Sequence, residues 1–133
     1  MKKIGIVVSK FNEEITKPML ENAKKRANEL GFKVELVAEV PGAFEIPLAA
    51  KKLLGNREID AVVTLGAVIK GDTNHDEVIA HSIAKSLLEL SLAYHKPVSL
   101  GVLGPNITFK QAHKRIKEYS ERAVDTIAEI LKE

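Results

Sequence analysis

Four apolar segments alternate with four helical segments along the 133-residue chain. The predicted strands span residues 3–9, 32–40, 61–69 and 98–103, and each is followed by a segment with helical spacing of its apolar residues. Strands that alternate with helices form a parallel sheet through right-handed crossovers, with helices on both faces. The order therefore predicts an α/β fold, a three-layer sandwich around a four-stranded parallel sheet, with residues 1–133 as one domain.

Helix starts are indicated by three threonines. Thr16, Thr73 and Thr108 are each predicted to cap a helix. Asp76 and Gln111 stand three positions after the second and third of these threonines, so both pairs predict capping boxes. A further helix is predicted from about residue 43 to 54, after a Pro-Gly pair. The apolar stripe that follows Thr108 predicts a single last helix that continues to the C-terminus.

Composition excludes several classes of protein. The chain is 45% hydrophobic and 29% charged with a net charge of +2, which argues against a disordered chain or a nucleic-acid surface. It has no cysteine, and no apolar run reaches membrane-spanning length. We therefore expect a cytoplasmic protein with no membrane or nucleic-acid partner. No metal is expected, because His75 and His81 are six positions apart and lie on different faces of a helix.

The unusual polar, Gly and Pro positions follow the predicted strands. They fall in residues 11–12, 41–45, 67–75 and 100–106. In open parallel sheets, ligands bind beyond the carboxyl ends of the strands. These segments are therefore predicted to meet in one site.

The segment from residue 61 to His75 carries the clearest chemical signal. It runs from an apolar strand through Lys70-Gly71-Asp72-Thr73 into a helix that has His75 in its first turn. A helix start offers free N–H groups and a positive dipole end, both of which favour an anion. A histidine beside an anion site can transfer protons on a phosphorylated substrate. The alternative is a capped loop followed by an exposed histidine.

Three further side chains have two interpretations each. Phe11 follows the first strand and either stacks on a heterocycle or packs in the core. Glu45 either complements a helix dipole or accepts hydrogen bonds from sugar hydroxyls. Arg115 is either a solvated charge or a bidentate partner for an oxyanion.

Four motifs are spread along the chain: Ser9-Lys10-Phe11-Asn12, Val40-Pro41-Gly42-Ala43-Phe44-Glu45-Ile46-Pro47, Gly66-Ala67-Val68-Ile69-Lys70-Gly71-Asp72-Thr73-Asn74-His75 and Gln111-Ala112-His113-Lys114-Arg115. Together they resemble the lumazine synthase family. The resemblance covers nearly the whole chain in the right order. It implies a flavodoxin-like fold and the condensation of 5-amino-6-ribitylamino-uracil with 3,4-dihydroxy-2-butanone 4-phosphate to 6,7-dimethyl-8-ribityllumazine, the penultimate step of riboflavin biosynthesis. It implies no cofactor.

The resemblance also implies a role for each matching residue. His75 would donate and accept protons. The phosphate would be bound by Gly71, Asp72, Thr73 and Arg115. The pyrimidine and ribityl groups would be bound by Phe11, Asn12, Ala43, Phe44, Glu45, Ala67, Val68, Ile69 and Leu100.

In this family the active sites form between neighbouring subunits, five to a ring. Leu100 and Arg115 would come from one protomer and complete the site of the next. Many relatives carry an aromatic residue where Leu100 stands, and many carry a lysine-containing turn after the arginine, where this chain offers Arg122. Free pentamers, decamers and closed icosahedral shells of 60 subunits all fit the sequence.

Three other hypotheses compete with lumazine synthase. A riboflavin synthase of the archaeal type shares the fold but would not need the phosphate arrangement at residues 71–75. A non-catalytic flavin or lumazine carrier, or a shell protein, would bind without turnover. A receiver-type signalling module would need an acidic cluster after the first strand, which Ser9-Lys10-Phe11-Asn12 does not supply.

Overall fold

A single parallel sheet organises the computed structural model, which describes residues 1–132. Its strands are β1 (Lys3–Ser9), β2 (Lys33–Val40), β3 (Ala61–Ala67) and β4 (Val98–Leu103). They stand in the order β2-β1-β3-β4, and every neighbouring pair is parallel. The α/β class and the four-stranded parallel sheet are confirmed.

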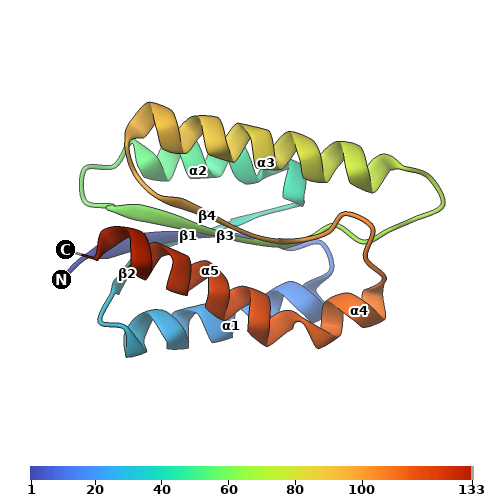
Figure 1. The fold of residues 1–133 in the computed structure, drawn as a ribbon, viewed down its shortest axis with the longest axis horizontal. Helices are drawn as coiled ribbons and strands as arrows, with labels where there is room; N and C mark the ends of the chain where they lie inside the picture. Colours follow the sequence, from blue (N-terminus) through green and yellow to red (C-terminus); the bar gives the residue numbers. More distant parts are fainter. Residues whose placement is uncertain (133) are drawn as a thin grey trace.

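Helices cover both faces of this sheet (Figure 1). On one face lie α1 (Glu13–Glu29) and α5 (Ile116–Leu131). The short helix α4 (Phe109–Lys114) lies in the chain between β4 and α5. On the other face lie the 3₁₀ turn η1 (Ala43–Glu45), α2 (Ile46–Leu54) and α3 (His75–Tyr94). The three-layer sandwich is therefore confirmed as well.

The alternation of side chains along each strand divides the interior into two cores. Ile6 and Val8 of β1 point toward α1 and α5, whereas Val7 between them belongs to the core under α2 and α3. In β3, Val63 and Val62 divide in the same way. Because helices cover both faces, both sets are apolar, which explains the nearly continuous apolar runs of the sequence.

The first helix begins earlier than its sequence predicts. Asn12 takes the N-cap position with a left-handed φ of 67°, and its carbonyl accepts from the amides of Ile15 and Thr16. Thr16 is buried within α1, so its predicted capping role is wrong. The left-handed turn at Asn12 lets the helix follow β1 almost directly. Gly31, with φ of 83°, ends the helix as expected.

The two predicted capping boxes have different outcomes. In the box before α4, Thr108 N donates to Gln111 Oε1 (2.9 Å) and Gln111 N donates to Thr108 Oγ1 (3.1 Å), which confirms that prediction. The box between Thr73 and Asp76 is wrong, because Asn74 is the N-cap of α3. The Asp76 carboxylate instead binds the loop after β4.

Two other boundaries differ from the prediction. The last helix is broken at Arg115 (φ −103°, ψ 6°), where the Arg115 amide donates to Ala112 O in a tighter turn. Ala112 and Ile116, on either side of the break, both lie in the core. The third strand ends at Ala67 and not at Ile69, although the Val68 amide still donates to Leu103 O.

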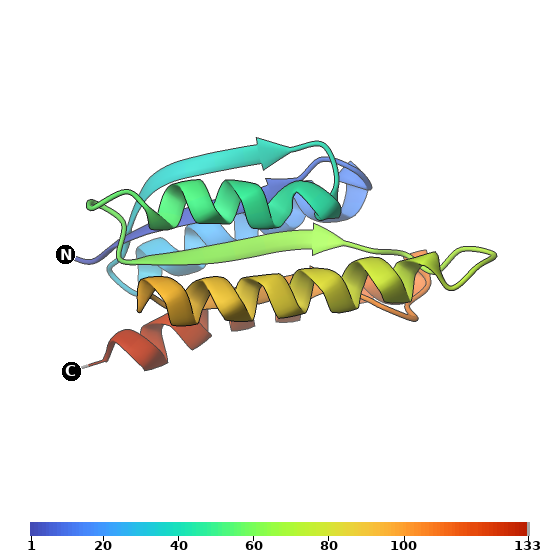
Figure 2. The same ribbon diagram turned by 90° about the horizontal axis from the view of Figure 1, so that it is seen from above.

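The strand directions separate the two ends of the molecule. The arrowheads of β2 and β3 point toward the end where the loop between β3 and α3 extends, and both termini lie at the opposite end (Figure 2). The other strands run the same way, because every neighbouring pair is parallel. Among residues 1–132, no helix combines the length and apolar character needed to cross a bilayer. The loops that carry the sequence motifs thus gather beyond the carboxyl ends of the strands.

Candidate active site

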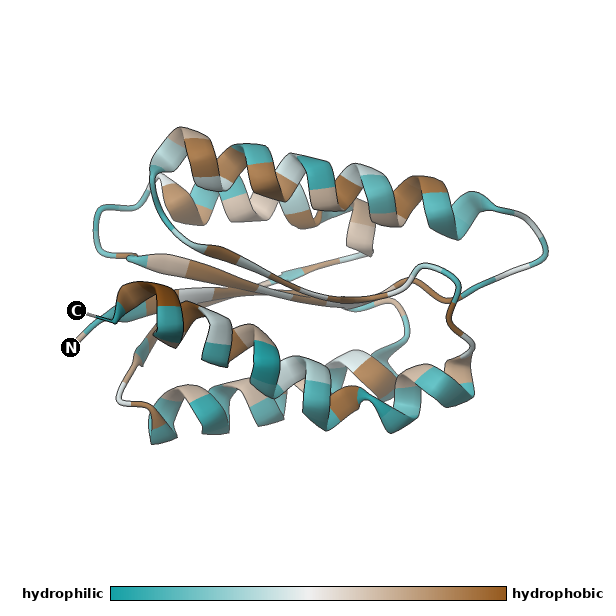
Figure 3. Ribbon diagram, viewed as in Figure 1, coloured by the Kyte–Doolittle hydropathy of each residue, from teal (hydrophilic) through white to brown (hydrophobic). Residues whose placement is uncertain are grey.

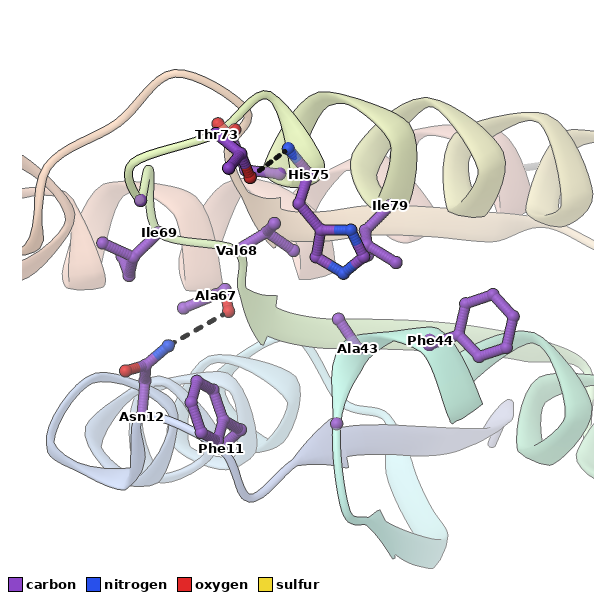
Figure 4. A pocket seen from close by; sticks show the side chains of 13 residues that line it. Phe11, Asn12, Ala43, Phe44, Ala67, Val68, Ile69, Thr73, His75 and Ile79 are labelled. Atoms are coloured by element: carbon purple, nitrogen blue, oxygen red, sulfur yellow. Dashed lines mark hydrogen bonds between the residues drawn. The ribbon is translucent and has the colours of Figure 1, made fainter.

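A cavity of about 430 Å³ lies beyond the carboxyl ends of β1 and β3. Ten of the residues singled out from the sequence line it. They are Phe11, Asn12, Ala43, Phe44, Ala67, Val68, Ile69, Gly71, Thr73 and His75. Three of the four motif segments, which lie up to about sixty residues apart in the sequence, therefore meet around one space, as the parallel topology requires (Figure 4).

The floor of the cavity is the chain as it leaves β3. Ala67 and Val68 are buried there, and Asn12 Nδ2 donates to Ala67 O (3.4 Å) from the side of α1. The Val68 amide donates a hydrogen bond to Leu103 O (2.7 Å), and the Lys70 amide donates one to Ile107 O (2.9 Å). These two N–H groups hold the loop after β4 and are not open to a ligand.

Two aromatic rings stand at the cavity with most of their surface in solvent. Phe11 is 70% exposed and Phe44 is 66% exposed. Phe11 comes from the turn between β1 and α1, whereas Phe44 comes from η1 on the opposite side (Figure 4). Exposed rings beside an apolar hollow are typical of a site that is completed by a ligand or a partner.

His75 supplies the imidazole at this site. It is the first residue of α3, and its side chain points into the cavity, between Val68 and Ala43 (Figure 4). Its backbone amide donates to Thr73 Oγ1 at 3.3 Å. Within residues 1–132 the imidazole has no hydrogen-bond partner, so both ring nitrogens can reach a ligand or water. An imidazole so placed can both take and return a proton.

A family model described as 6,7-dimethyl-8-ribityllumazine synthase matches residues 1–133. The chain belongs to this family. Three relatives bear the same name: one from Metallosphaera sedula is 56% identical over 93% of this chain and 82% of its own length. Those from Sulfolobus acidocaldarius and Saccharolobus solfataricus are 50% and 49% identical over 97% of this chain, and 82% and 84% of their own lengths are covered.

Two residues expected at a lumazine synthase site lie beside the cavity without lining it. Glu45 Oε1 accepts from Gly42 N (2.9 Å), which is the role expected of an acidic residue in the first turn of a helix. Asp72 is exposed in the loop before α3. Neither position brings the carboxylate into the hollow around His75.

Leu100 and the two arginines lie away from this cavity. Leu100 is half exposed on β4, the edge strand of the sheet. Arg115 is exposed at the break between α4 and α5, where its Nη1 donates weakly to Gln111 O (3.4 Å). Arg122 pairs with Glu118 (3.6 Å) and lies over the Tyr119 ring. Within one chain, the expected phosphate-binding arginine does not reach His75.

Three lining residues were not among the sequence candidates for ligand contact: Gly42, Asp76 and Ile79. Ile79 stands one helical turn after His75, so helical periodicity could have found it. Gly42 directly precedes Ala43, which the sequence predicts to contact the ligand. Asp76 was interpreted as a cap because its true partner, Asn106, is thirty residues away. No local pattern signals such a contact.

Proposed function

We propose that the protein condenses 5-amino-6-(D-ribitylamino)uracil with 3,4-dihydroxy-2-butanone 4-phosphate to 6,7-dimethyl-8-ribityllumazine, the penultimate step of riboflavin biosynthesis. Membership of the lumazine synthase family supports this reaction. The single structural observation that carries it is the cavity, in which an exposed aromatic ring, the chain leaving β3 and an imidazole with no hydrogen-bond partner among residues 1–132 meet.

The uracil and its ribityl chain occupy the part of the cavity between the two aromatic rings. Phe11 stacks on the pyrimidine, and the exposed face of its ring is available for this contact. Backbone groups of residues 67–69 bind the pyrimidine edge. Ala43, Phe44 and Glu45 hold the ribityl chain, and Glu45 keeps one carboxylate oxygen beyond the one used by Gly42.

His75 moves protons during the reaction. Imine formation, phosphate elimination, tautomerisation and ring closure each transfer a proton, and none of these steps changes the oxidation state of the pair of substrates as a whole. A neutral imidazole can accept a proton in one step and return it in another. The open ring nitrogens of His75 at the cavity wall support this role.

The phosphate of the second substrate lies at the start of α3. Gly71 and Thr73 line the cavity there, next to the first turn of the helix, whose positive dipole end favours an anion. Asp72 lies in the same loop. Arg115 binds the phosphate, because a guanidinium can bind a phosphate through two parallel hydrogen bonds.

Arg115 and Leu100 act on the site of a neighbouring copy in a homo-oligomer, a pentamer or a multiple of pentamers. Their distance from their own cavity supports this arrangement. The outer layer supports it too, because Leu48, Leu88 and Leu92 are each more than 60% exposed. Figure 3 shows apolar residues, in brown, recurring along α3. Exposed leucines on neighbouring helices are typical of a surface that a partner subunit buries. We assign the assembly to the cytoplasm.

The activity is tested by mixing the purified protein with both substrates and following the absorbance of the lumazine product. We expect a rate that is proportional to protein concentration and well above the spontaneous reaction. A matched sample without the phosphorylated substrate should form no product. A rate equal to the spontaneous background would refute the proposal.

Two further measurements separate this reaction from the competing hypotheses. Incubation with 6,7-dimethyl-8-ribityllumazine alone should yield no riboflavin, whereas a riboflavin synthase would form it. Light scattering on the purified protein should give a mass that is a multiple of five protomers of 14.6 kDa. A fully active monomer would contradict the shared site.

A further inference from the structure

Asp76 is a buried carboxylate in the wall of the cavity. It is the second residue of α3, directly after His75, and only 6% of it is exposed. Its Oδ2 accepts a hydrogen bond from the backbone amide of Asn106 at 2.8 Å. This bond joins the start of α3 to the loop between β4 and α4.

That loop is itself fixed against the cavity floor. Its two ends are bound by the amides of Val68 and Lys70, which donate to Leu103 O and Ile107 O. Between them, Gly104 packs so closely that a Cβ there would lie 2.4 Å from Val68 O. The Asp76 bond therefore connects the first turn of α3 to a segment that is hydrogen-bonded to the cavity floor at both ends.

The start of α3 has few other restraints. Asn74 makes no side-chain cap, and the bond from the His75 amide to Thr73 Oγ1 is long at 3.3 Å. Residues 71–75 are all exposed. Burying a carboxylate is costly unless a hydrogen bond compensates it, so an apolar side chain would suit this position better if it served packing alone.

We propose that Asp76 is a positioning residue that fixes His75 relative to the cavity floor through its hydrogen bond to the Asn106 amide. The inference rests on the proposed function, because the effect is measured on lumazine formation. It deepens that function by naming what holds the proton-transferring group in place.

Two substitutions with the same branched shape separate the hydrogen bond from packing. Asp76→Asn keeps an acceptor oxygen for the Asn106 amide, whereas Asp76→Leu places two larger methyl groups there and removes the acceptor. We expect Asp76→Leu to lower kcat at least about tenfold, because a small misplacement of a reacting group can cost up to about 10²-fold. The KM for the uracil substrate should change less than about twofold, and Asp76→Asn should retain most of kcat. Glu77→Ala, at the next and exposed position, is the matched control.

A double mutant tests whether Asp76 acts through His75. In a His75→Ala background, Asp76→Leu should cause no further loss of kcat, because the group that it positions is gone. Independent, multiplicative losses would overturn the proposal. So would an Asp76→Asn variant that is as impaired as Asp76→Leu, since that result would assign the effect to the charge.

Hydrogen exchange measured by mass spectrometry gives a readout that does not need activity. Peptides covering residues 103–108 should exchange faster in Asp76→Leu than in the unmodified protein or in Glu77→Ala. Unchanged exchange would overturn the proposal even if kcat falls. An unmodified protein that makes no lumazine would instead refute the proposed function, while faster exchange in Asp76→Leu would still support the contact.

Discussion

The two ends of the sheet are built from the same four strands but differ in the hydrogen bonding of their polar groups. At the amino end, Lys3 N donates to Asp60 Oδ2 (2.8 Å) and Lys3 Nζ to Glu58 Oε2 (2.6 Å). Lys96 Nζ donates there to the carbonyls of Leu54 (2.9 Å) and Asn56 (3.1 Å). At the carboxyl end, a cavity is bordered by exposed aromatic rings and by the imidazole of His75, which has no hydrogen-bond partner in the part of the chain that the structure describes.

This difference indicates that the amino end of the sheet contributes mainly to stability and the carboxyl end mainly to ligand binding and catalysis. Polar groups at the amino end bind one another and close the bottom of the sandwich, with Ile59 fully buried behind them. At the carboxyl end some polar groups also bind within the chain, but the His75 imidazole makes no hydrogen bond to any residue in the described range 1–132 and is open to a ligand. A substitution should therefore change stability at one end and activity at the other.

The largest expected effect is on stability at the amino end. Ile59→Ala removes a fully buried side chain from the core beneath α2 and should lower the free energy of unfolding by about 2–5 kcal/mol. The value of kcat at 25 °C should not change, because Ile59 lies at the opposite end from the cavity. Urea denaturation and steady-state kinetics on the same preparation check both statements.

Ile59→Val is the graded control for this prediction. It removes a single methylene group and should cost only about 0.5–1.5 kcal/mol. A fall in kcat that parallels the loss of stability across the two variants would break the separation between the two ends.

The next effect is on turnover at the carboxyl end. His75→Ala should lower kcat by about 10²-fold, the lower limit of general acid–base catalysis, because the exposed site lets water relay part of the proton transfer. Binding of the uracil substrate should survive, since Phe11 and the chain leaving β3 remain. Stopped-flow absorbance for turnover and fluorescence titration for binding measure the two quantities.

His81→Ala provides the comparison, because His81 is exposed on the same helix and does not line the cavity. It should leave both turnover and binding unchanged. If His75→Ala weakened uracil binding as much as turnover, His75 would have a structural role.

Most of the fold follows from local patterns in the sequence. Apolar runs and helical periodicity place all four strands and the layers of helices, and the exchange of bonds between Thr108 and Gln111 is a local signal that the structure confirms. One error falls where a distant contact decides, because Asp76 binds the loop after β4. Another falls at Arg115, where the last helix breaks while its apolar stripe continues across the break, so the periodicity gives no sign of it.

Most residues that line the candidate site could also be predicted from the sequence. Residues that come directly after strands were expected at one edge, and the parallel topology brings ten of them to one cavity. Asp76 could not be found this way, because its role depends on a pairing with a residue far along the chain. Leu100 and Arg115 need a second copy of the chain, which no pattern within one sequence specifies.

A smaller effect is expected for substrate affinity. Arg115→Ala should raise the KM for the phosphorylated substrate about tenfold, because a charge-assisted hydrogen bond contributes roughly 1.5 kcal/mol or more. The KM for the uracil substrate should stay nearly constant. Initial rates measured with each substrate varied in turn give both values.

Lys117→Ala removes a neighbouring exposed cation and serves as the control for a general loss of positive charge. It should leave both KM values unchanged. Equal increases for the two substrates in Arg115→Ala would contradict a phosphate-binding role and would weaken the case for a site shared between copies.

The smallest effect concerns the amino end again, through pH. The hydrogen bond and charge of Lys3 hold the pKa of Glu58 below its ordinary value of 4.5. A lowered pKa in the folded state means that the carboxylate stabilises the fold above about pH 4.5, and that this contribution is lost as the pH falls through the folded-state pKa. Glu58→Gln should therefore be slightly less stable than the unmodified protein at pH 7, and the difference should shrink as the pH is lowered through the folded-state pKa of Glu58.

The urea midpoints of the two proteins across this pH range measure the difference. Because the pair is solvent-exposed, the gap at pH 7 should shrink when salt is added. Turnover at pH 7 should be identical in the two proteins, since the substitution lies at the opposite end from His75. A change in kcat without a change in the urea midpoint would mean that the amino end communicates with the cavity, and the division between the two ends of the sheet would then fail.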